Sequence, residues 1–367
     1  MNGAAALAHP VAGEPIGADY LNALLERGPE SARVAAVRAV GSKAYGEEMV
    51  STAGRAIVEL DYEPDASPGL PRRLVVKLAR GVDEIMAPFY RNEVAFYAGL
   101  RPELDIEAPR CLGADYDEQS KRLGIALEDL TERGATFPNV LGDVRLDQVR
   151  SLLATLARLH ARFWNSPRFE ADLHWVETHL DGGVAELMNG LAPGYIQHEI
   201  DTQRFKRELV GRLGTTGDRL LAGVRAVQRH QARGPTTLLH GDAHLGNTYL
   251  VGDRGGLLDW QLSVRGHPIH DVSYLVTTAL SIAERRRHER ELLRFYLDRL
   301  AAEGVSGAPP FDAMLAEFGR ALVWGVYIGW LTTPVVNYGW EINVVNHLRL
   351  TAAYEDHDTA RLVDEVL

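Results

Sequence analysis

The chain has 367 residues, a formal net charge of −11 and a single cysteine, Cys111. This length exceeds what one compact core usually holds, so two domains are expected. The negative charge disfavours a nucleic-acid partner, because the phosphates would be repelled. A single cysteine excludes an intramolecular disulfide. No apolar run is long enough to span a membrane.

The chain begins with a segment rich in Ala, Gly and Pro, residues 1–18. It has neither the basic region nor the apolar core of a secretory signal peptide. We therefore expect a flexible tail and a cytoplasmic protein with no nucleic-acid or membrane partner. Nothing in the sequence indicates the oligomeric state.

The next part of the chain, residues 19–130, reads mainly as strands. Apolar alternation predicts a strand over 34–40, and apolar runs predict strands over 51–62 and 74–78, with two more near 112–116 and 123–130. Helical spacing predicts a helix over 86–100. The turn between the second and third strands carries Pro, Ser and Gly. The pattern predicts a small antiparallel sheet with one helix.

The remainder, residues 131–367, is mainly helical. A polar linker over 131–143 precedes a strongly amphipathic helix at 146–164. Further helices are predicted at 184–189, 204–213, 218–230, 271–282, 284–302, 311–331 and 341–354, with short strands at 236–240, 248–251 and 256–260. The predicted fold is therefore α+β and bilobal, with a small β-rich N-terminal lobe and a larger, mainly helical C-terminal lobe.

The densest chemical signal lies in the segment 239–247, which reads Leu-His-Gly-Asp-Ala-His-Leu-Gly-Asn. A strand ends there and another resumes, and a third strand ends soon afterwards on Asp259. Two strands that end on acids, with an asparagine between them, suit phosphoryl transfer, which requires a positioned nucleophile and Mg²⁺ ions that neutralise phosphate charge. Carboxylate and amide oxygens are hard ligands that Mg²⁺ prefers. Asp242 would then orient an acceptor hydroxyl and accept its proton.

The motif His240-Gly241-Asp242, with His244 and Asn247 after it, resembles the catalytic loop of the aminoglycoside phosphotransferase and choline kinase superfamily. That superfamily has a protein-kinase-like fold, and the closest likeness within it is the ecdysteroid-kinase-like branch. The resemblance implies an ATP-dependent kinase with Asp242 as catalytic base and with Mg²⁺ held by Asn247 and Asp259. It also implies that His240 and Asp271 support the catalytic loop structurally.

The resemblance extends upstream, to the nucleotide-binding lobe. Lys77 lies inside an apolar strand, and a buried unpaired charge is costly, so a partner such as Glu93 on the next helix is expected. The resemblance implies that Lys77 contacts the ATP phosphates, that backbone groups of Glu128 and Leu130 bind adenine, and that Gly46 belongs to the phosphate-covering loop. Lys77 taken alone could instead be an edge-strand lysine that faces water.

The acceptor is suggested by the segment 326–340, which is aromatic and uncharged. It favours a small neutral or apolar alcohol, with an aminoglycoside or other antibiotic as the alternative. Two further classes stay open: a metallohydrolase built from the His and Asp residues around Asp242, and a non-catalytic nucleotide-binding protein of kinase-like fold.

Overall fold

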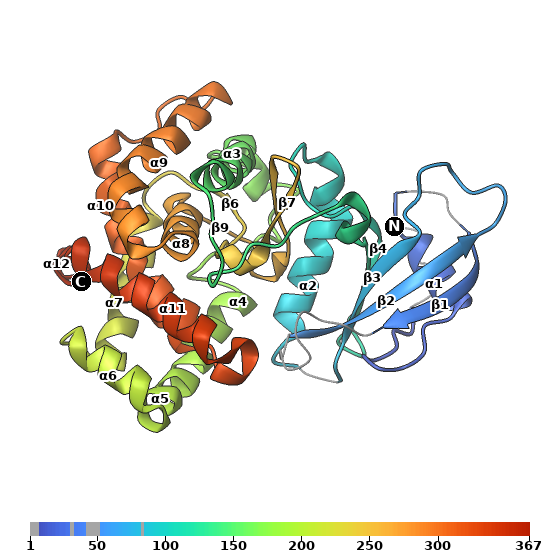
Figure 1. The fold of residues 1–367 in the computed structure, drawn as a ribbon, viewed down its shortest axis with the longest axis horizontal. Coiled ribbons are helices and arrows are strands. Elements are labelled where there is room, and N and C mark those ends of the chain that lie inside the picture. Colours follow the sequence, from blue (N-terminus) through green and yellow to red (C-terminus); the bar gives the residue numbers. More distant parts are fainter. Residues whose placement is uncertain (1–6, 30–32, 42–51, 82–83) are drawn as a thin grey trace. The chain divides into compact units, whose positions relative to one another are not determined.

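The computed structural model describes residues 7–29, 33–41, 52–81 and 84–367. The chain divides into two compact units, Met1–Thr136 and Phe137–Leu367 (Figure 1). In the ranges just given, unit 1 contains a sheet and two α-helices, and unit 2 is mostly helical. The predicted α+β class, with a β-rich N-terminal part and a mainly helical remainder, is confirmed.

The sheet of unit 1 has five strands in the order β1-β2-β3-β5-β4, and every neighbouring pair is antiparallel. The strands are β1 (Val34–Gly41), β2 (Ala53–Tyr62), β3 (Arg73–Ala79), β4 (Cys111–Asp117) and β5 (Arg122–Glu128). Each overlaps a strand predicted from the sequence. β3 is the central strand, so the reading of Lys77 as an edge-strand residue is wrong.

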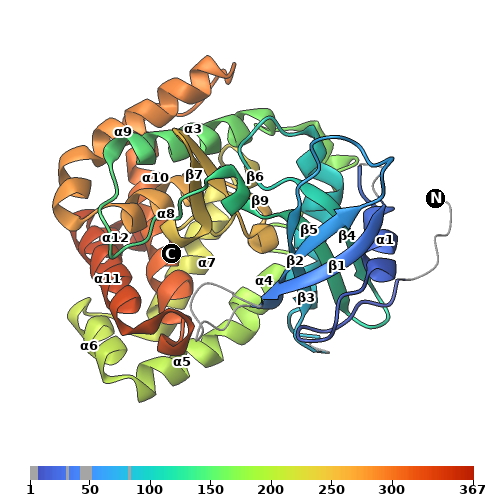
Figure 2. The ribbon, with the colours of Figure 1, turned by 45° about the vertical axis from the view of Figure 1, so that its right-hand side comes forward.

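The two faces of β3 carry different chemistry because successive side chains point to opposite sides of a sheet. Leu74, Val76 and Leu78 pack with helix α1 (Ala18–Leu25) in one apolar core. Lys77 points the other way, toward helix α2 (Ala87–Ala95). Figure 2 shows α1 beside the sheet strands.

Two features of unit 1 differ from the prediction. Helix α1 is present in addition to the one predicted helix, and the segment before it, which was expected to be a flexible tail, makes specific contacts. His9 is 2% exposed, and its ring is bonded to Asp115 Oδ2 at 3.0 Å and to the Tyr20 hydroxyl at 3.1 Å. Part of the expected tail is therefore anchored on the sheet. The sequence did not reveal this because α1 is only eight residues long and Asp115, the partner of His9, lies 106 residues further along the chain.

Within the described residues, unit 2 contains ten α-helices and two two-stranded antiparallel sheets. The helices are α3 (Leu146–Arg162), α4 (Gly183–Glu186), α5 (Ala192–Thr202), α6 (Arg204–Arg212), α7 (Gly217–Gln231), α8 (Ile269–Ala279), α9 (Ile282–Ala302), α10 (Phe311–Trp324), α11 (Val335–Asp356) and α12 (Thr359–Asp364). Strand β6 (Thr237–Leu239) pairs with β9 (Val264–Gly266), and β7 (Thr248–Val251) pairs with β8 (Arg254–Leu257). Helices α5 and α12 were not predicted.

Helix α8 is the centre of unit 2, and every one of its residues is buried. It lies among α3, α9, α10 and α11 (Figures 1 and 2). The predicted helix over 311–331 changes to π-helical geometry at Gly325–Leu331. In the described part of the chain, no helix combines the length and apolar character that crossing a membrane requires.

Candidate functional site

The loop after β6 carries the His-Gly-Asp motif, and its glycine is required by the backbone. Gly241 has a φ of +81°, in the left-handed region that side chains disfavour. A Cβ atom at this position would lie 1.9 Å from the carbonyl oxygen of Leu262. The loop therefore passes directly against the chain that follows β8, and only glycine allows this approach.

Asp271, in the first turn of α8, braces this loop. Its Oδ2 accepts a hydrogen bond from His240 N at 2.7 Å, and its Oδ1 accepts one from Gly241 N at 3.0 Å. His160 on α3 donates from Nε2 to Asp271 Oδ2 at 3.2 Å, and the Tyr296 hydroxyl donates to His160 Nδ1 at 2.8 Å. Burial alone would raise the pKa of Asp271, but the hydrogen bond from His160 and the neighbouring imidazoles lower it to about 2. The loop is thus fixed by a buried carboxylate that stays charged.

Asp271→Asn is expected to destabilise the protein by about 1–3 kcal/mol. The amide keeps only one acceptor oxygen, and its NH₂ group would face a backbone N–H, so one of the two hydrogen bonds to the loop is lost. The lowered pKa means that this carboxylate contributes stability fully above about pH 4 and loses the contribution as the pH falls through about 2. The gap between wild type and variant in urea unfolding should therefore be large at pH 7 and shrink on acidification. Asp298→Asn, at an exposed position on α9, is the control; equal midpoints for all three proteins at pH 7 would contradict the bracing role.

The carboxylate of Asp242 is oriented by Asn247. The Asn247 Nδ2 group donates to the carbonyl oxygen and to the Oδ2 of Asp242, both at 2.9 Å. His244 Nδ1 accepts from Gly246 N at 3.0 Å, so the proton is on Nε2, which lies 3.8 Å from Asp242 Oδ2. Burial lowers the pKa of His244, and the ring is neutral near pH 7. The Asp242 side chain keeps 19% of its surface exposed, so its carboxylate is accessible to a reactant.

His240 joins this loop to the strand that precedes Asp259. Its Nδ1 accepts from Asp242 N at 3.2 Å, which leaves the ring proton on Nε2, and Nε2 donates to the Leu258 carbonyl oxygen at 3.0 Å. Leu258 N donates to the Asn247 carbonyl oxygen at 3.0 Å. The predicted strand over 256–260 ends at Leu257 instead, because Asp259 adopts a left-handed backbone conformation with a φ of 69°. Such strained residues cluster at functional sites.

The donors around Asp242 suit a magnesium ion. The Asn247 amide nitrogen is turned to Asp242, so its oxygen is directed to the opposite side of the planar amide. This oxygen and the Asp259 carboxylate are hard donors of the kind that Mg²⁺ prefers. Within the described ranges, no group of three or more His, Cys, Asp and Glu side chains is arranged to hold a metal ion. A magnesium ion would therefore need water or phosphate oxygens to complete its coordination.

Unit 1 holds the predicted nucleotide-binding residues. Lys77 Nζ lies 2.6 Å from both carboxylate oxygens of Glu93, and the two residues are 3% and 1% exposed. At the end of β5, Glu128 N donates to the Arg110 carbonyl oxygen at 3.0 Å, whereas Arg110 N donates at 2.9 Å to Oε1 of the Glu128 side chain and not to its backbone. The Leu130 carbonyl oxygen accepts from Ala135 N at 3.1 Å. Gly46 lies outside the described residues.

Several aromatic rings surround His244, and the sequence did not reveal this grouping. The rings of Tyr274, Trp330 and Tyr338 lie 5.8, 6.0 and 6.3 Å from the His244 ring, centroid to centroid. Trp330 is only 2% exposed and belongs to the core of unit 2, whereas Tyr338 is partly buried. Tyr274 follows Asp271 by three residues on α8, and that spacing was the one signal that could have placed it near the loop.

Comparisons with known proteins concern the family and the fold. The model of the ecdysteroid kinase-like family matches residues 45–304. Choline kinase from Cryptosporidium parvum Iowa II is 13% identical with a TM-score of 0.56, over 90% of this chain and 91% of that one. The GDP complex of wild-type aminoglycoside 2'-phosphotransferase-IIIa is 12% identical with a TM-score of 0.50, and the match covers 88% of this chain and 93% of that one. A search of curated proteins gave no match. At these identities the two structures show the fold alone, which is the predicted protein-kinase-like fold.

Proposed function

Because the chain belongs to the ecdysteroid kinase-like family, we propose that it is an ATP-dependent kinase that phosphorylates a hydroxyl group of a small molecule. Residues 19–130 form the nucleotide-binding lobe in this proposal, and residues 131–367 form the catalytic and acceptor-binding lobe. The observation that carries the proposal is the position of the Asp242 carboxylate. Asn247 holds this carboxylate by a hydrogen bond, and Asp271 accepts hydrogen bonds from the backbone of the loop that carries it. Phosphoryl transfer depends mainly on such positioning.

Asp242 acts as the base in this proposal. Its accessible carboxylate orients the acceptor hydroxyl and takes its proton, while Asn247 keeps Oδ2 in place. Asn247 and Asp259 would hold Mg²⁺, which neutralises charge on the phosphates when bound. The hydrogen bonds of His240 to both segments fix the spacing between Asp242 and Asp259.

Lys77, Glu93, Glu128, Leu130 and Gly46 are assigned to ATP binding. The Lys77–Glu93 ion pair presents an ammonium group of defined position to the phosphates. The Glu128 carbonyl oxygen and the Leu130 N–H are the backbone groups that we assign to adenine, since Glu128 N and the Leu130 carbonyl oxygen already have protein partners. The phosphate-covering loop with Gly46 rests on the family resemblance alone.

The two rival classes are less well supported. A metallohydrolase needs a cluster of His and Asp ligands, and the described residues contain none arranged to bind a metal. His240 and His270 instead donate to backbone carbonyl oxygens, and Asp271 accepts from backbone N–H groups. A non-catalytic nucleotide-binding protein would have no need of an accessible, oriented Asp242. Measured turnover distinguishes it from the kinase.

The decisive experiment is ADP release with Mg·ATP across a panel of hydroxylated compounds. The panel spans aminoglycosides, macrolides, choline, sugars, sterols and hydroxy acids, and Asp242→Asn is the inactive control. Acceptor-dependent ADP release that the variant lacks would establish the kinase and its acceptor class. Failure of the protein to bind Mg·ATP at all would overturn the proposal.

We assign the acceptor to the class of small neutral or apolar alcohols, with an aminoglycoside or other antibiotic as the alternative. The rings near Asp242 are aromatic and uncharged, since His244 is neutral. Tyr338→Ala is expected to raise the acceptor KM by about 3–10-fold, the worth of one aromatic contact, and to leave the KM for ATP unchanged. Trp330, which is buried in the core, is unsuited to this test because its loss would affect folding.

Tyr116→Ala on β4 is the matched control for Tyr338→Ala, because it removes the same side chain from unit 1. The control should leave the acceptor KM unchanged. Equal acceptor KM values for wild type and Tyr338→Ala would remove the aromatic pocket from the proposal. A preference for polycationic acceptors in the ADP-release panel would favour the antibiotic alternative.

A further inference from the structure

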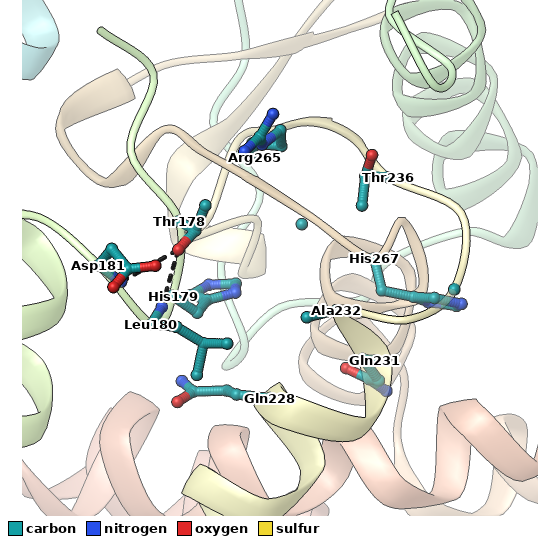
Figure 3. Close-up of a pocket in the computed structure, with 12 residues that line it drawn as sticks. Thr178, His179, Leu180, Asp181, Gln228, Gln231, Ala232, Thr236, Arg265 and His267 are labelled. Atoms are coloured by element: carbon teal, nitrogen blue, oxygen red, sulfur yellow. Dashed lines mark hydrogen bonds between the residues drawn. The ribbon is translucent and has the colours of Figure 1, made fainter. Parts of the chain in front are cut away.

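Unit 2 contains a cavity that is separate from the loop that carries Asp242. Its volume is about 460 Å³, within the range of roughly 300–1,000 Å³ that small-molecule sites occupy. Figure 3 shows it between the segment 178–181, the end of α7 and the neighbouring ends of β6 and β9. None of its lining residues belongs to the segment 240–247 or is Asp259.

The lining is polar, and its one acidic side chain, Asp181, is exposed to solvent. Burial lowers the pKa of His179 to about 3 and that of His267 to about 4, so both imidazoles are neutral at pH 7. Arg265 is already paired with Glu170 at 2.6 Å and stacks over the Phe169 ring. An anion would therefore find no unengaged cation among these residues.

Apart from Asp181 and Arg265, the polar side chains of the lining are hydroxyls, amides and imidazoles, which suit an uncharged ligand. Thr236, Gln228 and Gln231 border the cavity with the two neutral histidines (Figure 3). His267 Nδ1 accepts from Ile269 N at 3.3 Å, so its proton is on Nε2, where it can be donated. Such a set offers both donors and acceptors, which is the complement of a molecule with several hydroxyl groups.

One wall of the cavity is connected to the catalytic loop. The His179 ring lies 4.6 Å from the ring of His270, centroid to centroid. His270 Nε2 donates to the Gly241 carbonyl oxygen at 3.1 Å, and Gly241 directly precedes Asp242. A ligand that moves or fixes the His179 ring therefore acts on the loop through two contacts.

We propose that this cavity is a second small-molecule site, which binds an uncharged, hydroxyl-rich compound and is coupled to the catalytic loop through His179 and His270. The site does not depend on the kinase activity proposed above, since binding can be measured without phosphoryl transfer. Its ligand acts as an effector, because the cavity shares no residue with the proposed transfer site.

Binding is tested on the full-length protein by saturation-transfer NMR titration with myo-inositol, glucose and glycerol as probes. Ala232, which lines the cavity at the end of α7, is replaced by Trp to fill it. Arg229→Trp adds the same side chain to an exposed position of α7 that does not line the cavity. We expect saturable binding of at least one probe, retained in Arg229→Trp and reduced at least tenfold in Ala232→Trp. No saturable binding to wild type, or equal binding to both variants, would overturn the site.

The coupling is tested by hydrogen exchange of the peptide that contains residues 240–247. The bound probe should change its exchange rate severalfold in wild type and Arg229→Trp, and leave it unchanged in Ala232→Trp. Binding without any change in this peptide would refute the connection through His270. Neither measurement requires turnover, so failure here is distinguishable from failure of the proposed kinase activity.

Discussion

Asp242→Asn is expected to lower kcat by about 10²–10⁴-fold, the usual contribution of a positioned general base. The amide has the same shape, so the loop should keep its bonds to Asp271, which involve only the backbone of His240 and Gly241. The affinity for Mg·ATP should stay within about twofold, because Asp242 is not assigned to the nucleotide. Steady-state kinetics with the acceptor found in the panel, together with calorimetric titration of ATP, would measure both quantities.

Asp253→Asn is the matched control for this experiment. Asp253 is exposed in the turn between β7 and β8, and Ser151 binds its backbone carbonyl oxygen, which the substitution keeps. Its kcat should equal that of wild type. If Asp242→Asn retained full kcat, Asp242 would not be the base. Loss of ATP affinity together with kcat would instead indicate that Asp242 contributes to nucleotide or metal binding.

Lys77→Met is expected to destabilise the protein by about 3–5 kcal/mol, the typical result of leaving one buried partner of an ion pair uncompensated. Glu93 is 1% exposed and both of its carboxylate oxygens lie at 2.6 Å from Lys77 Nζ, so the remaining charge would have little access to water. The same substitution should weaken Mg·ATP binding, since the proposed phosphate contact is lost. Chemical unfolding and calorimetry measure the two effects separately.

The double variant Lys77→Met/Glu93→Leu separates stability from function. Replacing a buried ion pair by apolar residues of similar volume is often neutral or stabilising, so the unfolding midpoint should return toward wild type. ATP binding should stay weak if Lys77 contacts the phosphates. Recovery of ATP affinity in the double variant would show that the pair is structural only. Lys121→Met, at a surface ion pair with Glu118, controls for the loss of a positive charge and should change neither quantity.

The sequence by itself determined the elements whose signals are local. Short apolar runs, one of them alternating, predicted all five strands of unit 1, because such runs are local signals that need no partner. The cost of a buried charge predicted a partner for Lys77, and the ion pair with Glu93 is present. The spacing of His240, Asp242 and Asn247 pointed to one loop, because they lie within seven positions of one another between two short strands.

Only the tertiary structure decided features that join distant segments. Asp271 meets His160 across 111 residues, His160 meets Tyr296 across 136, and His9 meets Asp115 across 106. No periodicity in the sequence encodes such pairs, because their partners are chosen by how helices and strands pack. Packing also decided that Trp330 is in the core and Tyr338 is not, and it left the cavity beside His179. Local patterns fix what each segment becomes, whereas burial and contact, which depend on the whole chain, fix which side chains can act together.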